Sequence, residues 1–233
     1  PMDPGSAPDR APAALVLDLD GTLVDTVEIR IHAWLDVFEE FDIPATRELV
    51  ASMIGIDGKR LARDIAEAAG RPLRGGVDEE IDRRCGEIYE SLNQDPQALP
   101  GARELLRWLD EEEWPWAIAT SSRREQVGTS LKALGLGRDP AIVDGSSVEH
   151  AKPAPDLLLA AAAALHRSPA DCWCIGDSTW DMRAAIAAGM TPVGVTAGAA
   201  VPAETLRQAG AVLVTDTLME LQAELHRARG GSV

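Results

Sequence analysis

The sequence predicts an α/β fold, in which a Rossmann-like parallel sheet is flanked by helices and carries an inserted α-helical cap domain. Two observations lead to this prediction. After about residue 100, short apolar runs alternate with segments of helical periodicity, a pattern typical of parallel strands connected by helices. Between about residues 26 and 96 the pattern is helical throughout, which indicates a separate insert.

The first strand is predicted at residues 13–17, because five consecutive apolar residues indicate burial on both faces of a parallel sheet. Asp18 and Asp20 follow it, two residues apart, and side chains with this spacing share a face. Gly21 allows the backbone to curl around a small anion with N–H groups pointing at it. Since ligands bind at the carboxyl ends of parallel strands, this edge is predicted to bind a phosphoryl group.

The helical insert begins after Thr26, where apolar residues recur at helical spacing. Its helices are predicted at about residues 31–38, 47–52, 59–69 and 78–92. The chain passes between the two parts near Thr26 and near Gln97, and these crossings are natural hinges for a cap that excludes water from the sheet edge. We divide the chain into a disordered start (1–12), a core (13–25 and 97–233) and a cap (26–96).

Five further strands are predicted at residues 116–119, 141–143, 172–175, 191–195 and 211–214. Polar segments accompany this second part of the chain. Residues 120–122 (Thr-Ser-Ser) end the second strand, Lys152 lies in a proline-bounded turn, and residues 176–181 (Gly-Asp-Ser-Thr-Trp-Asp) follow a third apolar run. Each segment is therefore predicted at the same edge of the sheet as Asp18.

Together, the segments at 18–26, 120–122, 151–156 and 176–181 resemble the four ordered motifs of the haloacid dehalogenase-like (HAD) superfamily. The resemblance is to the branch with a helical cap after the first motif, which includes phosphoglycolate phosphatases and β-phosphoglucomutases. It implies phosphoryl transfer through an aspartyl-phosphate, which splits one difficult step into two.

The resemblance also implies the catalytic roles. Asp18 is expected to attack phosphorus, and Asp20 to protonate the leaving alcohol and then deprotonate the attacking water. Thr120 is expected to offer its hydroxyl and backbone N–H to a phosphate oxygen, and Lys152 to bring a positive charge to the same anion. Lys152 is further expected to hold the carboxylates of Asp18 and Asp177 together.

Asp177 and Asp181 lie four residues apart at the start of a predicted helix, so they share a face. With Asp18, and with the backbone carbonyl of Asp20 that the resemblance implies, they form an oxygen-only ligand set. Such a set suits Mg²⁺, whereas zinc favours His and Cys clusters that this chain lacks. Asp181 has two interpretations: it binds the metal, directly or through water, or it caps the helix.

Other residues are predicted to contact the phosphate or substrate: Gly21, Thr22, Ser121, Ser122, Arg123, Lys59 and Arg60. The last two lie in a segment, residues 55–60, that resembles the substrate-selecting loop of capped family members. Lys59 or Arg60 then meets a carboxylate or a second phosphate of the substrate. The alternative is that both are solvated residues at the start of a helix.

A formal net charge of −16 opposes binding to nucleic acid or to an anionic membrane surface. No segment at the start of the chain has the pattern of a secretion signal, and the three cysteines form no framework, so a cytoplasmic location and reduced cysteines are expected. The negatively charged protein repels a phosphorylated substrate, so Mg²⁺ and a few basic residues must supply positive charge at the site. The oligomeric state is unknown from the sequence.

We predict an Mg²⁺-dependent phosphatase of a small phosphorylated metabolite of the phosphoglycolate or sugar phosphate type. Asp20 favours phosphate esters over the dehalogenase and phosphonate reactions of the superfamily. A β-phosphoglucomutase-like sugar phosphomutase is the alternative, but those enzymes carry a histidine where this chain has Arg30 and a Gly-Val-Ser-Arg segment where it has residues 55–58. A non-enzymatic binding module that retains the fold is a third reading, against which the intact catalytic residue types count.

Overall fold

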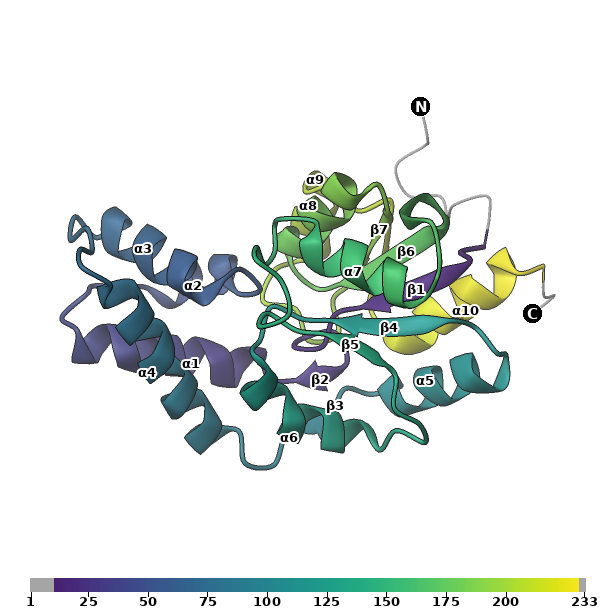
Figure 1. Ribbon diagram of the computed structural model, residues 1–233, viewed down its shortest axis with the longest axis horizontal. Coiled ribbons are helices and arrows are strands. Elements are labelled where there is room, and N and C mark those ends of the chain that lie inside the picture. The colour runs from purple at the N-terminus through teal and green to yellow at the C-terminus, as the bar shows by residue number, and fades with distance from the viewer. Residues whose placement is uncertain (1–10, 231–233) are drawn as a thin grey trace.

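In the computed structural model, which describes residues 11–230, a sheet-based body and a helical body lie side by side (Figure 1). The predicted disordered start lies outside the described residues up to residue 10. Pro12 differs from that prediction, because it is buried and its carbonyl accepts a hydrogen bond of 2.9 Å from the Trp114 indole. The packed part of the core therefore begins before residue 13.

Six parallel strands form the main sheet in the order β5-β4-β1-β6-β7-β8. Their bounds are β1 Ala14–Leu17, β4 Trp116–Ala119, β5 Ala141–Val143, β6 Cys172–Gly176, β7 Thr191–Val195 and β8 Leu213–Thr215. β1 lies in the middle, where Leu17 pairs with Ile118 of β4 and Ile175 of β6. The predicted Rossmann-like α/β core is confirmed, with the last strand starting two residues later than expected.

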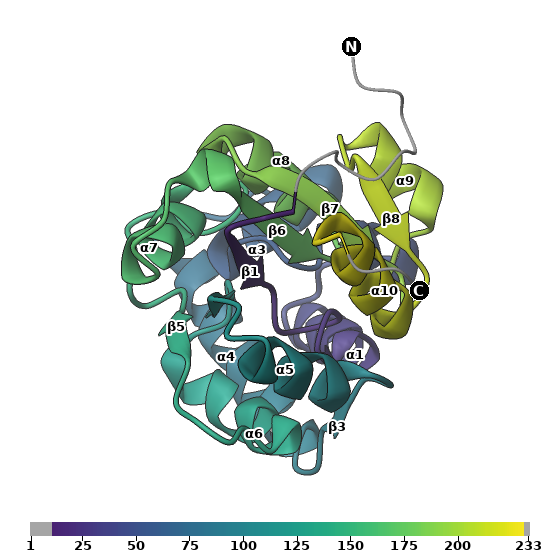
Figure 2. The same cartoon turned by 90° about the vertical axis from the view of Figure 1, so that its right-hand side faces the viewer.

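Helices cover both faces of this sheet (Figure 2). They are α5 Ala102–Glu111, α6 Arg124–Leu134, α7 Asp156–Ala164, α8 Thr179–Ala188, α9 Ala203–Gln208 and α10 Leu218–Ala228, with a 3₁₀ turn at Pro169–Asp171. Successive residues of β1 serve opposite faces. Leu15 and Leu17 enter a cluster with residues of α5 and α10, while Ala14 and Val16 enter a cluster with residues of α7 and α8.

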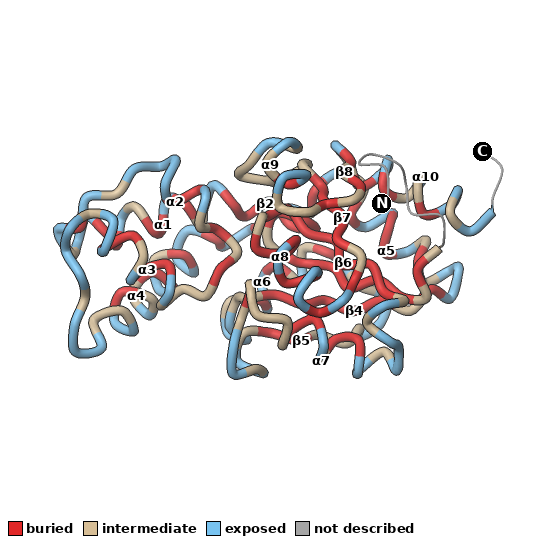
Figure 3. Tube along the Cα trace, turned by 90° about the horizontal axis from the view of Figure 1, so that it is seen from above, coloured by how far each residue is buried: buried red, intermediate tan, exposed pale blue. Residues whose placement is uncertain are grey.

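The helical body contains α1 Val27–Glu40, α2 Arg47–Met53, α3 Gly58–Ala68 and α4 Val77–Leu92. The buried inner faces of its helices form a hydrophobic cluster (Figure 3), which Trp180 of the core helix α8 joins. A two-stranded antiparallel ribbon, β2 Val24–Asp25 and β3 Gln97–Ala98, pairs the two crossings of the chain. This arrangement supports our proposal that residues 26–96 act as a cap hinged near Thr26 and Gln97.

Within residues 11–230 no helix has both the length and the apolar character needed to cross a membrane. The three cysteines are free and buried, in agreement with the expectation that they are reduced core residues.

Candidate active site

The floor of the site is built around a buried lysine. Lys152, only 1 % exposed, lies with its Nζ 2.5 Å from Asp18 Oδ1, 2.7 Å from Asp181 Oδ1 and 2.9 Å from the Ala119 carbonyl. Burial by itself would lower the pKa of Lys152, but the carboxylates of Asp18 and Asp181 outweigh it and raise that pKa above its usual value. Lys152 is therefore a permanent cation. It joins Asp18 to Asp181, which corrects the expected pairing of Asp18 with Asp177.

Three buried carboxylates, those of Asp18, Asp177 and Asp181, converge so that one oxygen of each lies within 4.8 Å of the others. Burial raises the pKa of Asp18 to about 7, against the lowering effect of Lys152. Burial also raises the pKa of Asp177 well above its usual value, and the neighbouring Asp18 adds to the rise. One lysine does not balance three buried carboxylates, so the site favours an added cation.

This donor set fits Mg²⁺, because all its ligand atoms are oxygens and they carry excess negative charge. Asp181 differs from the other two carboxylates. Its Oδ2 accepts hydrogen bonds from the Ser178 N–H at 3.0 Å and the Ser178 hydroxyl at 2.6 Å, and these bonds form a capping box at the start of α8. The helix-capping interpretation of Asp181 is therefore observed, and its Oδ1 belongs to the carboxylate cluster at the same time.

The turn after β1 holds Asp177 rather than lining a cavity. Gly21 has a positive φ of 84°, and a Cβ there would lie 2.2 Å from Asp177 Oδ2. Its N–H donates to the Val24 carbonyl at 2.9 Å, and the fully buried Thr22 donates its hydroxyl to Asp177 Oδ1 at 3.2 Å. We expected the Gly21 N–H and Thr22 to contact phosphate, but in the structure the Gly21 N–H binds Val24 and Thr22 binds Asp177. The reason is that the turn closes on itself and packs against Asp177.

Asp20 is held from four sides. One oxygen accepts from the Thr26 hydroxyl at 2.7 Å and from the Tyr89 hydroxyl at 3.3 Å. The other accepts from the Ser122 hydroxyl at 2.7 Å and lies 3.6 Å from the Arg30 guanidinium. Tyr89 and Arg30 belong to the cap, so the contacts of Asp20 include residues of both bodies. Its position depends on the placement of the cap against the core.

The segment after β4 connects core and cap. Thr120 lines the cavity, but its N–H donates to the Val143 carbonyl at 3.0 Å, so only its hydroxyl is available for a phosphate oxygen. The Ser121 hydroxyl donates to the Gly55 carbonyl at 3.0 Å, and the Arg123 guanidinium donates to Asp82 of α4. Ser121, Ser122 and Arg123 all line the cavity, and their contact with phosphate or substrate stays a prediction.

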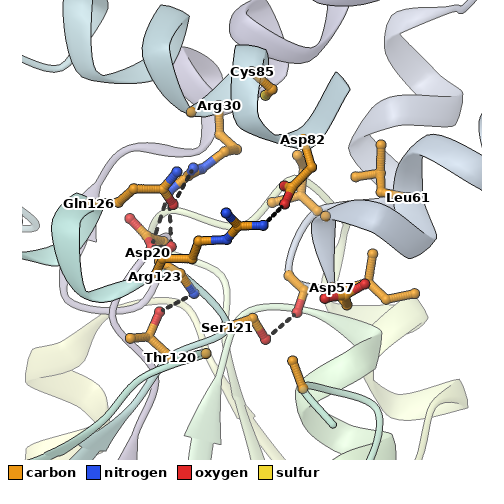
Figure 4. A pocket seen from close by; sticks show the side chains of 18 of the residues that line it. Asp20, Arg30, Asp57, Leu61, Asp82, Cys85, Thr120, Ser121, Arg123 and Gln126 are labelled. Carbon is orange, nitrogen blue, oxygen red and sulfur yellow. Dashed lines mark hydrogen bonds and ion pairs between the residues drawn. The ribbon is translucent and has the colours of Figure 1, made fainter. Parts of the chain in front are cut away.

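Cap and core enclose a cavity of about 100 Å³ over Asp18 and Asp20. The cap contributes apolar walls from Trp34, Ile56 and Leu61 together with polar side chains, and the core contributes residues 120–123 and the amide of Gln126. Figure 4 shows labelled side chains of the cap, such as Arg30 and Leu61, and of the core, such as Arg123 and Gln126, around this cavity. The enclosed volume suits a compact ligand, since one water needs roughly 10–15 Å³ measured in this way.

Lys59 and Arg60 do not line this cavity. Lys59 pairs with Glu79 at 3.4 Å and Arg60 with Asp64 at 3.4 Å. Both line a second, more open cleft between α3 and core residues 145–154, which adjoins the cavity because Asp57, Arg123, Gly145 and Ala151 line both. The reason that the pair does not line the cavity is helical periodicity, because Asp57, Gly58 and Leu61 share the face of α3 that meets the cavity. Their salt bridges agree with the alternative of solvated residues at a helix start, the Arg60 guanidinium also lies 5.7 Å from the centre of the Trp180 ring, and a substrate contact of this pair stays a prediction.

Sequence reasoning missed four polar residues of the cap–core interface: Arg30, Asp82, Tyr89 and Gln126. Asp82 and Tyr89 lie with the buried Cys85 along one stripe of α4, at the spacing i, i+3 and i+7. A charged residue on an otherwise apolar stripe is a signal that a closer look at the helical pattern detects.

Comparisons with known proteins agree with this geometry. The chain is 35 % identical over 191 residues to β-phosphoglucomutase of Bacillus subtilis, covering 79 % of this chain and 84 % of that enzyme. It is 32 % identical over 203 residues to phosphoglycolate phosphatase of Pseudomonas putida, covering 82 % and 72 % of the two chains. The crystal structure of a hydrolase from Pseudomonas syringae superposes with a TM-score of 0.86 at 33 % identity, covering 94 % and 99 %. The profile of haloacid dehalogenase-like hydrolases matches residues 15–195, and the chain therefore belongs to this family of enzymes.

Proposed function

We propose that this enzyme is an Mg²⁺-dependent phosphatase that hydrolyses a small phosphorylated metabolite, of the sugar phosphate or phosphoglycolate type, through an aspartyl-phosphate. The observation that carries the proposal is the pair Asp18 and Asp20 at the end of the central strand. Asp18 is bound to a permanent cation, Lys152, and both carboxylates line one cavity closed by the cap.

In the first step, an Asp18 oxygen forms a bond to phosphorus as the bond from phosphorus to the ester oxygen breaks. The leaving alkoxide takes a proton from Asp20, which the hydroxyls of Thr26 and Ser122 orient. In the second step, water attacks the phosphorus of the aspartyl-phosphate and gives a proton to Asp20. Phosphate leaves, and Asp18 is regenerated.

The surrounding residues prepare this chemistry. Lys152 keeps Asp18 in place and offers positive charge beside the transferred group, and the Thr120 hydroxyl faces the same cavity. Asp18 and Asp177 would hold Mg²⁺, together with the Asp20 carbonyl and, through water, Asp181. When bound, Mg²⁺ neutralises the charge of the phosphoryl oxygens. The closed cap leaves Asp18 only 8 % exposed, which limits access of bulk water.

The test is hydrolysis of p-nitrophenyl phosphate with and without Mg²⁺. Asp18→Asn removes the nucleophilic charge and keeps the shape, so it should abolish turnover while leaving the circular dichroism spectrum and the melting temperature close to those of the wild type. A purified Asp18→Asn protein that keeps substantial activity would refute the role of Asp18. A wild type with no phosphatase activity, tested on this ester and on sugar phosphates, would favour the binding module instead.

A phosphomutase is the second candidate, because the chain is similar to a β-phosphoglucomutase over most of its length. Both reactions share the first step and differ in whether water or a sugar hydroxyl accepts the phosphoryl group. Phosphatase is preferred because Arg30 stands where those mutases carry a histidine and is occupied with Asp20, Ser122 and Tyr89.

A further inference from the structure

The cavity has an unusual balance of charge for a site that binds an anion. Besides Asp18 and Asp177, three carboxylates line it, those of Asp20, Asp57 and Asp82, against two guanidinium groups, those of Arg30 and Arg123. Both cations already have partners. Arg123 donates to Asp82, and Arg30 lies 3.6 Å from Asp20 and 3.4 Å above the centre of the Tyr89 ring.

Asp82 is held firmly in this position. Its side chain is 15 % exposed and lies between Arg123 of the core and the start of α3. A Cβ added at Gly58 would lie 1.9 Å from Asp82 Oδ1, so the missing side chain at residue 58 makes the room that Asp82 fills. Figure 4 shows the Arg123 guanidinium reaching towards Asp82, with Gln126 and Asp57 nearby.

This arrangement provides both kinds of hydrogen-bonding group. The carboxylates of Asp57 and Asp82 accept hydrogen bonds, whereas the guanidinium of Arg123 and the amide of Gln126 donate them. A hydroxyl group does both, so neighbouring hydroxyls of one ligand suit such a site. A carboxylate or second phosphate would instead face Asp57 and Asp82 without an uncompensated cation, and desolvating an unpaired anion is costly.

We propose that Asp82 and Arg123 bind hydroxyl groups of the substrate's organic half, so that the enzyme selects phosphate esters of neutral polyhydroxylated compounds over esters that carry a second anion. This inference rests on the proposed phosphatase function and narrows its substrate class. Because Asp82 comes from the cap and Arg123 from the core, the pair requires the cap to lie against the core, as it does in this structure.

The test compares kcat/KM of the wild type and Asp82→Asn for sorbitol 6-phosphate, fructose 1-phosphate and 2-phosphoglycolate, with p-nitrophenyl phosphate as reference. The wild type should prefer the two polyhydroxylated esters. Asp82→Asn should lower kcat/KM for them by about 10–100-fold, the effect of losing a hydrogen bond to a charged group. Hydrolysis of 2-phosphoglycolate should be unchanged or faster, because a repelling charge is gone. The matched control is Glu79→Gln, which removes the charge of an exposed carboxylate of α4. It should leave kcat/KM unchanged for all four substrates.

Gly58→Ala separates the position of Asp82 from its charge. The added methyl group displaces Asp82 while every charge is kept. The kcat/KM for the polyhydroxylated esters should therefore fall again by about 10-fold or more, and kcat/KM for 2-phosphoglycolate should not rise. Gly128→Ala in α6 is the control, because a Cβ there meets no atom within 4 Å.

Binding to the Asp18→Asn protein, measured by calorimetry in the presence of Mg²⁺, provides the same comparison without turnover. Sorbitol 6-phosphate should bind more tightly than 2-phosphoglycolate, and Asp82→Asn in that background should remove the difference. Failure of the phosphatase function would appear as no hydrolysis of any ester, with the binding preference retained. The inference would be overturned by a wild type that prefers 2-phosphoglycolate. It would also be overturned if Asp82→Asn lowered the affinity and kcat/KM for all esters equally.

Discussion

At the scale of residues, the site depends on a few side chains that satisfy one another in a buried environment. Lys152 forms ion pairs with the carboxylates of Asp18 and Asp181, the Thr22 hydroxyl donates to Asp177, and the Ser178 hydroxyl donates to Asp181. Burying charge without partners is costly, so each contact positions a carboxylate as well as stabilising it. Residues that touch no substrate therefore influence activity through Asp177 or Asp181.

Gly21→Ala tests this dependence. The new Cβ would lie 2.2 Å from Asp177 Oδ2, so Asp177 must move and the Mg²⁺ concentration for half-maximal activity should rise by about 10-fold or more. The positive φ of 84° adds a strain of roughly 1–2 kcal/mol. Gly70→Ala is the control, because it carries similar strain at φ 71° with no atom within 4 Å, and it should lower the melting temperature without changing the Mg²⁺ requirement. Equal metal dependence in the two variants would contradict the role given to the turn.

At the scale of elements, the ends of parallel strands and the start of one helix assemble the site. Asp18 follows the end of β1, Thr120 follows the end of β4, and β6 leads through Asp177 into α8. The capping box of α8 links helix stability to the site, because Asp181 is both the third residue of the helix and a partner of Lys152. Trp180 of the same helix donates its indole N–H to the Ser52 carbonyl of the cap at 3.1 Å.

Ser178→Ala should therefore affect stability and activity together. Loss of the N-cap hydroxyl is expected to cost about 1 kcal/mol, and the loss of its bond to Asp181 should reduce kcat or raise the Mg²⁺ requirement. Thr217→Ala removes the equivalent cap of α10, where Thr217 accepts from the Glu220 N–H at 3.1 Å away from the site. It should cost similar stability and leave kcat/KM unchanged. Thermal unfolding and steady-state kinetics on both variants decide the matter.

At the scale of the whole molecule, the two bodies meet over the cavity, and the paired ribbon of β2 and β3 joins them. The contacts between them include polar ones, of Ser121 with Gly55, of Arg123 with Asp82 and of the cap residues around Asp20, and an apolar one, in which Trp180 of α8 packs into the cap cluster. A hinged interface with many polar contacts is suited to opening for substrate entry and product release.

The stability of the metal-free protein should fall as the pH rises. In the folded chain the pKa of Asp18 is about 7, against 3.8 for an ordinary aspartate, and the pKa of Asp177 is also raised. The folded protein then holds protons that the unfolded chain has released, so this stabilisation is fully present below about pH 4 and is lost as the pH passes through 7. Melting temperatures in EDTA should decrease from pH 5 to pH 8, less steeply for Asp177→Asn. Added Mg²⁺ should restore stability most at pH 8, where protons no longer compete with the metal for the carboxylates of Asp18 and Asp177. A flat profile in EDTA would contradict the raised pKa values.

Product analysis separates the two candidate reactions of the whole enzyme. If water is the normal acceptor, free phosphate should accumulate in proportion to the ester consumed, because nothing returns the phosphoryl group to the sugar. The measurement follows inorganic phosphate and hexose phosphates during incubation with a hexose 1-phosphate. Formation of the 6-phosphate with little free phosphate, faster with added bisphosphate, would replace the phosphatase by a mutase.

The sequence by itself determined the fold class and the chemistry of the site floor. Apolar runs of four or five residues locate strands because burial on both faces excludes polar residues, and the polar residues that follow them must then lie at one sheet edge. On this basis Asp18, Asp20, Lys152 and Asp177 were all placed at the end of the sheet, as the structure has them.

Only the tertiary structure decided which of these side chains touch. Asp181 rather than Asp177 is the partner of Lys152, because the capping box turns its carboxylate towards the floor while the turn at Gly21 packs against Asp177. The cap face was decided in the same way. α3 begins at Gly58, and Lys59 and Arg60 do not line the cavity. Asp82 meets Arg123, 41 residues along the chain, only when the two bodies pack together. Contacts between distant segments depend on packing geometry that local sequence patterns do not contain.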